Sequence, residues 1–242
     1  MIDINCDLGE GLNNEAEIMP FISSCSIACG GHAGSKRTIR KVVDLALKHQ
    51  VKIGAHPSFP DKANFGRIRL EMSSNDLKES IEEQIQWVVD VCHEKNVQLH
   101  HVKPHGALYN LVAIDHFHSE IVINAIKNKA PDSFLYVPYN SIIQKVADKA
   151  GIKCKVEAFA DRNYNSDLTL VSRNLENAVI TDKKQLIDHL LKMILSKKVK
   201  SIDGVEVELT AETYCFHGDN PNALELLKYA SKELLKTGIK IA

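Results

Sequence analysis

Short β-type runs alternate with longer helical patterns along the chain, and this alternation limits the possible folds more than any other feature. The strand-like runs cover 2–6, 26–30, 51–55, 99–103, 134–138, 153–159 and 213–217. Between them, apolar residues recur at helical spacing over 36–49, 75–95, 140–150, 183–196 and 222–235. Such alternation favours a parallel sheet with helices packed outside it. Closure would bury every strand edge, so we predict a seven-stranded, TIM-like parallel (β/α) barrel, with an open doubly wound sheet as the alternative.

The length supports a single domain over 1–242. The chain has 242 residues, close to the roughly 250 that are typical of a closed α/β barrel. No internal repeat and no Pro/Gly/Ser-rich linker marks a boundary. Two segments are expected as excursions from the alternating pattern, 166–182 and 201–208, and the second is predicted to be a small hairpin around Asp203 and Gly204.

Composition and charge exclude several functional classes. Thirty basic residues against thirty-one acidic ones give a net charge of -1, which predicts neither a nucleic-acid partner nor a membrane anchor. No apolar run approaches the length of a membrane span, and the first residues do not resemble a signal peptide, so we expect a cytoplasmic protein. The six cysteines form no CxxC pair and are expected to be reduced core residues.

Ionisable residues occur where the predicted strands end. In a parallel barrel, loops from all strands converge at the carboxyl-terminal rim, where catalytic groups are found. Six of the seven strands reach such residues, which are Asp7 and Glu10, His32, His56, Lys103 and His105, Glu157 and Asp161, and His217 and Asp219. We predict that these side chains line one mouth. The histidines on predicted helices are expected at the surface: His49, His93, His116, His118 and His189.

Strand parity supports this arrangement. Side chains two residues apart share one face of a strand. Asp3, Asn5 and Asp7 therefore share one face, and the apolar residues between them share the other. His101, Lys103 and His105 alternate in the same way with Val102 and Pro104. The polar set is thus predicted to line the barrel, while the apolar set packs against the helices.

These residues are compatible with two chemistries. Asp7, His32 and His56 offer ligands for a divalent metal, although their spacing matches no HExxH-type motif. Alternatively, Asp7, Glu157 or Asp161 could position and deprotonate water. Lys103, His105 and Arg162 would then stabilise developing negative charge. Serine catalysis is not expected, because the sequence has no GxSxG motif.

Several sequence blocks resemble the LamB/YcsF family, whose members are the A subunit of prokaryotic 5-oxoprolinase. In order along the chain, the blocks are IDINCDLGEG, SIACGGHAG, IGAHPSFPD with NFGR, HVKPHGALYN, EAFADRNY, LVSR and FHGDNP. The chain departs from the family pattern at Gly31, where an aromatic residue is usual, and at Ser35, where an aspartate is usual. HPSFPD also replaces the usual HPGYPD.

The resemblance implies a barrel of the glycoside hydrolase/deacetylase type. It further implies ATP-dependent opening of 5-oxo-L-proline to L-glutamate, with release of ADP and phosphate, in concert with partner subunits B and C. The cofactors would be ATP and a divalent metal, either Mg²⁺ with the nucleotide or an ion in the site. Whether ATP binds this chain or a partner is left open.

The residues expected to form the site fall into two sets. The catalytic set is predicted to be Asp7, His56, Lys103, His105, Glu157 and Asp161. The substrate-binding set is predicted to be Glu10, His32, Tyr109, Arg162, Arg173, His217 and Asp219. Among the cations, arginine suits bidentate binding of a planar anion.

Two other functions stay open at this point. One is a metal-dependent amide hydrolase or deacetylase that acts alone on a small or carbohydrate amide. Bound zinc and ATP-independent hydrolysis would indicate it. The other is a non-catalytic binding subunit, in which changes in the mouth would alter affinity and leave turnover of the complex intact at saturating substrate.

Overall fold

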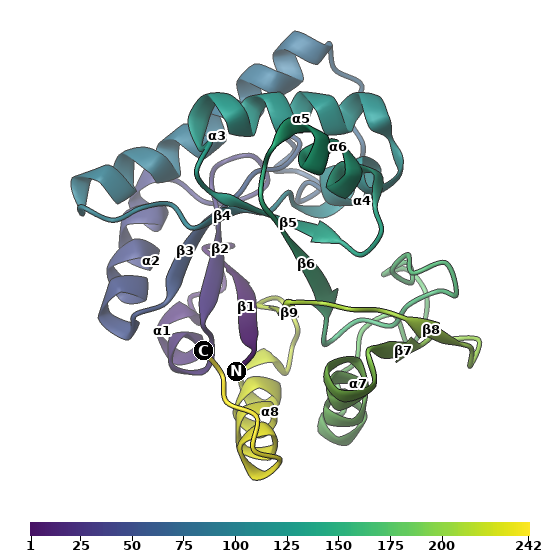
Figure 1. Ribbon diagram of the computed structural model, residues 1–242. Helices are drawn as coiled ribbons and strands as arrows, with labels where there is room; N and C mark the ends of the chain where they lie inside the picture. The colour runs from purple at the N-terminus through teal and green to yellow at the C-terminus, as the bar shows by residue number, and fades with distance from the viewer.

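A computed structural model describes residues 1–242 and contains one closed parallel barrel (Figure 1). Its strands are β1 (Asp3–Leu8), β2 (Ser24–Ala28), β3 (Lys52–His56), β4 (His101–Val102), β5 (Phe134–Pro138), β6 (Cys154–Phe159) and β9 (Thr213–His217). They pair in the order β1-β2-β3-β4-β5-β6-β9, and β9 closes the barrel by pairing with both β6 and β1. The predicted seven-stranded barrel is confirmed, and the open sheet is wrong.

Helices cover the outside of the barrel, as Figure 1 shows. They are α1 (Glu15–Ile18), α2 (Lys36–His49), α3 (Ser74–Glu94), α4 (Gly106–Ile114), α5 (His116–Lys129), α6 (Ile142–Ala150), α7 (Lys183–Ser196) and α8 (Ala223–Lys236), with a 3₁₀ turn η1 (Met19–Phe21). Ser35 caps α2 by accepting a hydrogen bond from the Thr38 amide at 3.1 Å. None of the helices combines the length and apolar character that a membrane crossing requires.

Three helices, α1, α4 and α5, were not predicted. The buried residues of α5 include Ile121, Val122 and Ile123 in succession, so its apolar residues do not form the single stripe that indicates an amphipathic helix.

Strand β4 is shorter than the predicted run 99–103. The Lys103 amide still donates to the Ala55 carbonyl at 2.9 Å, but Pro104 has no N–H with which to continue the ladder.

The hydrophobic core lies between the strands and the helices, while the interior of the barrel is polar. Ile4 and Cys6 belong to the apolar core. Asp3 points inward and accepts hydrogen bonds from Ser24 and Thr213, both at 2.7 Å. The predicted parity of β1 is therefore confirmed. All six cysteines are free, and all but the half-buried Cys154 are buried.

The two predicted excursions are present. A long loop, 160–182, follows β6, and a hairpin formed by β7 (Lys198–Lys200) and β8 (Glu206–Glu208) follows α7. His189, which was predicted at the surface, is only partly exposed. Its ring stacks on Tyr164, its Nε2 atom is buried, and burial lowers the pKa of His189 to about 4. The helix α7 turns this side chain toward the base of the long loop.

Close packing inside the barrel requires a glycine at position 54. The His101 ring stacks on Tyr136 with 3.9 Å between ring centroids. A Cβ atom placed on Gly54 of the neighbouring strand β3 would lie only 2.1 Å from His101 Nε2. The His101 ring therefore occupies the space that a side chain at position 54 would need.

We expect Gly54→Ala to lower the free energy of unfolding by roughly 1–3 kcal/mol, because the added methyl group must displace the buried His101 ring. Urea unfolding of the full chain would measure this change. In the His101→Ala background, the same glycine substitution should cost much less. Equal costs in the two backgrounds would contradict the steric explanation.

Acidification should destabilise the barrel through His101. Burial, together with the neighbouring His100, holds the pKa of His101 well below its usual value. The unfolded histidine takes up a proton near pH 6.5 while the folded one stays neutral, so stability falls as the pH drops below about 6.5, by up to about 1.4 kcal/mol per pH unit. Urea unfolding at several pH values should show a shallower slope for His101→Gln. The exposed control His116→Gln should keep the original slope, and identical slopes for all three proteins would contradict this account.

Candidate functional site

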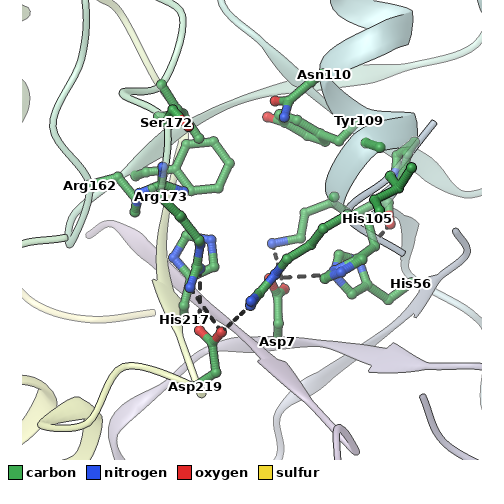
Figure 2. Close-up of a pocket in the computed structure, with 18 of the residues that line it drawn as sticks. Asp7, His56, His105, Tyr109, Asn110, Arg162, Ser172, Arg173, His217 and Asp219 are labelled. Atoms are coloured by element: carbon green, nitrogen blue, oxygen red, sulfur yellow. Dashed lines mark hydrogen bonds and ion pairs between the residues drawn. The ribbon is translucent and has the colours of Figure 1, made fainter. Parts of the chain in front are cut away.

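A cavity of about 620 Å³ opens at the carboxyl-terminal ends of the strands (Figure 2). Ten of the predicted site residues line it: Asp7, Glu10, His56, Lys103, His105, Tyr109, Arg162, Arg173, His217 and Asp219. Three do not, namely His32, Glu157 and Asp161. The structure thus gathers most of the predicted residues around one space and places the other three behind its wall.

The ammonium group of Lys103 is the charged centre of the cavity floor. It lies 2.6 Å from Asp7 Oδ1 and donates hydrogen bonds at 3.0 Å to Asn5 Oδ1 and Glu157 Oε1. Burial alone would lower the pKa of Lys103, but Asp7, Cys215 and Glu157 raise it well above its usual value. The lysine therefore stays charged. Its three N–H protons are already directed at protein partners. Lys103 therefore supports Asp7 and has no free donor for an anionic ligand.

Asp7 connects this lysine to a histidine. Its Oδ2 atom lies 3.4 Å from His56 Nε2. Burial would raise the pKa of Asp7, yet the neighbouring His56 and Lys103 hold it well below its usual value. Asp7 therefore remains a carboxylate across the physiological pH range. It can orient an imidazole or a water molecule.

Two histidines continue the chain into the cavity. His56 Nδ1 donates to the Lys103 carbonyl at 2.7 Å, and His105 Nε2 donates to the Phe65 carbonyl at 3.0 Å. The remaining nitrogens, His56 Nε2 and His105 Nδ1, face each other at 2.9 Å. Burial and the neighbouring histidines lower the pKa of His105 well below its usual value. Both rings are thus anchored by backbone carbonyls, and their two facing nitrogens need one shared proton or a bound cation between them.

His32 lies behind this pair. Its ring stacks on His105 with 3.7 Å between centroids, and its Nδ1 and Nε2 atoms lie 3.0 Å from Ser58 Oγ and 3.1 Å from Glu10 Oε1. Ser58 Oγ donates its own proton to the Phe59 carbonyl, so His32 Nδ1 is the donor to Ser58. Burial lowers the pKa of His32 to about 2, and burial followed by the charge of Asp7 raises the pKa of Glu10 well above its usual value. His32 therefore positions Glu10 and does not contact the cavity.

Glu157 and Asp161 also support other residues. Glu157 lies beneath Lys103, and its second oxygen, Oε2, is buried without a hydrogen-bond partner, as is the hydroxyl of Tyr109. Asp161 lies 2.7 Å from His217 Nδ1 and accepts hydrogen bonds from the His217 amide and Asn220, both at 3.1 Å. It therefore fixes the ring of His217 at the cavity wall. Strand parity correctly predicted that Glu157 faces the barrel interior, but it did not indicate how deep along the barrel axis this residue lies.

Two arginines meet one carboxylate at the cavity rim. Arg67 Nη2 and Arg173 Nη1 donate to the same oxygen of Asp219 at 2.5 and 2.9 Å. Figure 2 shows Arg173 and Asp219 pointing toward one another. Two guanidinium groups against one carboxylate leave a local excess of positive charge, which favours an anionic ligand.

The guanidinium group of Arg162, by contrast, binds backbone carbonyls of the protein itself. Its guanidinium donates to the carbonyls of Ala178 and Val171 at 3.1 and 2.5 Å, which holds the loop 160–182 together. Burial lowers the pKa of Arg162 to about 10, and it remains charged at neutral pH. It lines the cavity, and two of its five N–H donors are used by these carbonyls.

Several lining residues were missed from the sequence. They are Asn64, Arg67, Asn110, Phe159, Ser172 and Asn174, among others. They lie in loops, on the unpredicted helix α4 or at the end of β6. The family blocks NFGR, HVKPHGALYN, EAFADRNY and LVSR contain all of them except Asn174. The family blocks were the sequence feature from which these lining residues could have been predicted.

Comparison with known proteins shows one consistent relationship. The LamB/YcsF family model matches residues 2–242. A protein of Shouchella clausii (strain KSM-K16), named as the A subunit of 5-oxoprolinase, is 40% identical over 99% of this chain and 97% of its own. The crystal structure of a lactam utilization protein from Thermus thermophilus superposes with a TM-score of 0.92 at 35% identity, covering 99% and 98% of the two chains.

A more distant structure shares the fold alone. A GH18 chitinase from Pseudoalteromonas aurantia has a TM-score of 0.53 at 11% identity, covering 96% of this chain and 100% of its own. This likeness shows a shared barrel fold. From the match along its whole length and the identity to its relatives, the chain belongs to the LamB/YcsF family.

Proposed function

We propose that the chain is the A subunit of a 5-oxoprolinase, a cytoplasmic hydrolase that opens the five-membered lactam of 5-oxo-L-proline to L-glutamate. ATP is consumed to ADP and phosphate, and the chain acts together with partner subunits B and C. Family membership and the name of its relatives support this proposal, as does the name of the Thermus thermophilus protein, which refers to use of a lactam.

One observation carries the proposal. A carboxylate–imidazole chain formed by Asp7, His56 and His105 lies in the same cavity as the pair Arg67 and Arg173. Opening a lactam acid needs a group that moves protons and a cation that holds the substrate carboxylate. The cavity supplies both.

The ring opening divides among these residues as follows. The arginines bind the substrate carboxylate, and water adds to the lactam carbonyl carbon. The proton from this water passes to the His56 and His105 pair, which Asp7 orients. When the ring C–N bond breaks, a proton from the pair passes to the leaving nitrogen, so the pair returns to its starting state.

ATP is needed because an amide is a poor electrophile. Transfer of the terminal phosphoryl group to the amide oxygen makes the carbonyl carbon easier to attack. After water has added and the ring C–N bond has broken, the new carboxyl group carries the phosphoryl group, and a second water releases it as inorganic phosphate. Mg²⁺ would accompany the nucleotide. The cavity contributes the groups for water attack, and the partners complete the coupled reaction.

The direct test is turnover of 5-oxoproline by the full chain, alone and with partners B and C, with and without ATP. We expect glutamate and phosphate to appear in equal amounts only with partners and ATP. Glutamate release by the chain alone without ATP would contradict the proposal. That result would favour a metal-dependent amide hydrolase, for which three donors in the cavity, Glu10, His56 and His105, offer a specific basis.

Asp7→Asn should reduce kcat of the assembled enzyme by about 100-fold or more, because the neutral amide no longer orients His56 or balances Lys103. The change in KM should be small. Steady-state kinetics of glutamate release would measure both. Asp90→Asn, an exposed site on α3, serves as the control, and kcat within a factor of two of the wild type for Asp7→Asn would contradict this role.

Arg173→Gln should raise KM for 5-oxoproline by roughly 10-fold or more with a smaller effect on kcat, because one of two guanidinium groups facing the substrate carboxylate is lost. The exposed Arg69→Gln is the matched control. An unchanged KM would show that the substrate carboxylate binds elsewhere.

A further inference from the structure

We propose that Glu10, His56 and His105 form a binding site for one divalent transition metal ion of the zinc class, with His32 as the residue that positions Glu10. The site goes beyond the proposed reaction and does not depend on it. An ion there would take the ring nitrogens that accept the proton in that reaction, so the two states exclude each other. It also differs from the trio expected from the sequence, Asp7, His32 and His56.

The separations between the donor atoms fit such an ion. His56 Nε2 and His105 Nδ1 are 2.9 Å apart, and His105 Nδ1 is 3.6 Å from Glu10 Oε1. All of these atoms lie within 4.8 Å of one another. Tetrahedral coordination at about 2.0–2.1 Å requires ligand atoms roughly 3.3–3.4 Å apart, so small side-chain shifts would complete the geometry.

The far edges of both rings are already fixed in the way that metal-binding histidines require. A ligating histidine generally donates its other ring N–H to a carbonyl or carboxylate, which sets the tautomer. His56 Nδ1 donates to the Lys103 carbonyl and His105 Nε2 donates to the Phe65 carbonyl. The remaining nitrogens of both histidines consequently face each other beside the carboxyl group of Glu10.

Two of the residues expected from the sequence are less suitable. Asp7 Oδ1 is held by the Lys103 ammonium at 2.6 Å. The His32 ring is nearly parallel to His105, with 5° between the ring planes and 3.7 Å between centroids. Ring lone pairs lie in the ring plane, so two stacked rings cannot both point at one ion. His32 instead contacts Glu10 at 3.1 Å from the side away from the cavity.

The arrangement leaves the ion open to ligands. Glu10, His56 and His105 all line the cavity, whereas His32 does not. Three protein ligands leave a fourth position free for water or a carbonyl oxygen, which is the pattern of catalytic zinc sites. Two imidazoles and one carboxylate favour zinc, cobalt or nickel over Mg²⁺, which prefers an all-oxygen shell.

Metal affinity of the purified full chain, without substrate or partners, tests the site. Co²⁺ added to the chelator-treated protein should bind with one-to-one stoichiometry and give the visible absorption of a low-coordinate ion, and Zn²⁺ should displace it. His56→Asn, His105→Asn and Glu10→Gln should each weaken Co²⁺ binding by about 100-fold or more. His32→Gln should weaken it by roughly 10–100-fold, as loss of an outer positioning contact does.

Two controls separate this site from others. His217→Asn changes a different histidine of the same cavity and should keep the wild-type affinity, as should the exposed His116→Asn. Circular dichroism establishes that each variant is folded. The site is refuted if the wild type binds no Co²⁺ or Zn²⁺, or if His56→Asn and His105→Asn bind as tightly as the wild type. Because no turnover is measured, failure of the proposed hydrolysis would leave this result unaffected.

Discussion

The ammonium group of Lys103, enclosed in the barrel, is the constraint on which the rest of the structure depends. It lies between carboxylates of β1 and β6, so one ion network ties these two strands of the closed sheet to the segment that follows β4. Burying charge is costly, and removing one member of such a network leaves an uncompensated charge in the interior. The barrel interior is therefore polar as a whole. The apolar core is displaced to the layer between strands and helices, where the helices supply its other half.

This polar interior explains which parts of the fold and site the sequence could predict. Alternation along β1 placed Asp7 inward, and the apolar residues between the acids identified the strand, so both the element and the direction of its side chains were visible. Periodicity carries no information about depth along the barrel axis. Glu157 was thus expected at the mouth although it lies beneath Lys103, and Asp161 was expected there although it supports His217.

Loops were the other limit of sequence reasoning. His32 follows β2 in a turn, where strand parity no longer applies, and it stacks behind His105. Arg67 comes from a loop without periodic pattern, and its place at the rim is decided by its contact with Asp219 from the far end of the chain. Such contacts form only once the barrel has closed, so local sequence patterns do not contain them. The family block NFGR marked the region that contains Arg67, but it did not indicate that Asp219 is the partner of this arginine.

The site combines side chains that reach the cavity with side chains that hold them in position. His56 and His105 reach the cavity, and backbone carbonyls fix their outer edges. His32 and Asp161 stand one layer further back and orient Glu10 and His217. The backbone and the rear layer together limit the freedom of the front residues, which reduces the entropy lost when a reacting group must be positioned.

The shared carboxylate at the rim has a consequence for how tightly any anion is held. An incoming carboxylate or phosphate must compete with Asp219 for the guanidinium donors of Arg67 and Arg173, so part of each new contact replaces an existing one. The internal competitor weakens net affinity and speeds departure of a charged product. It also holds both guanidinium groups in place when no ligand is bound.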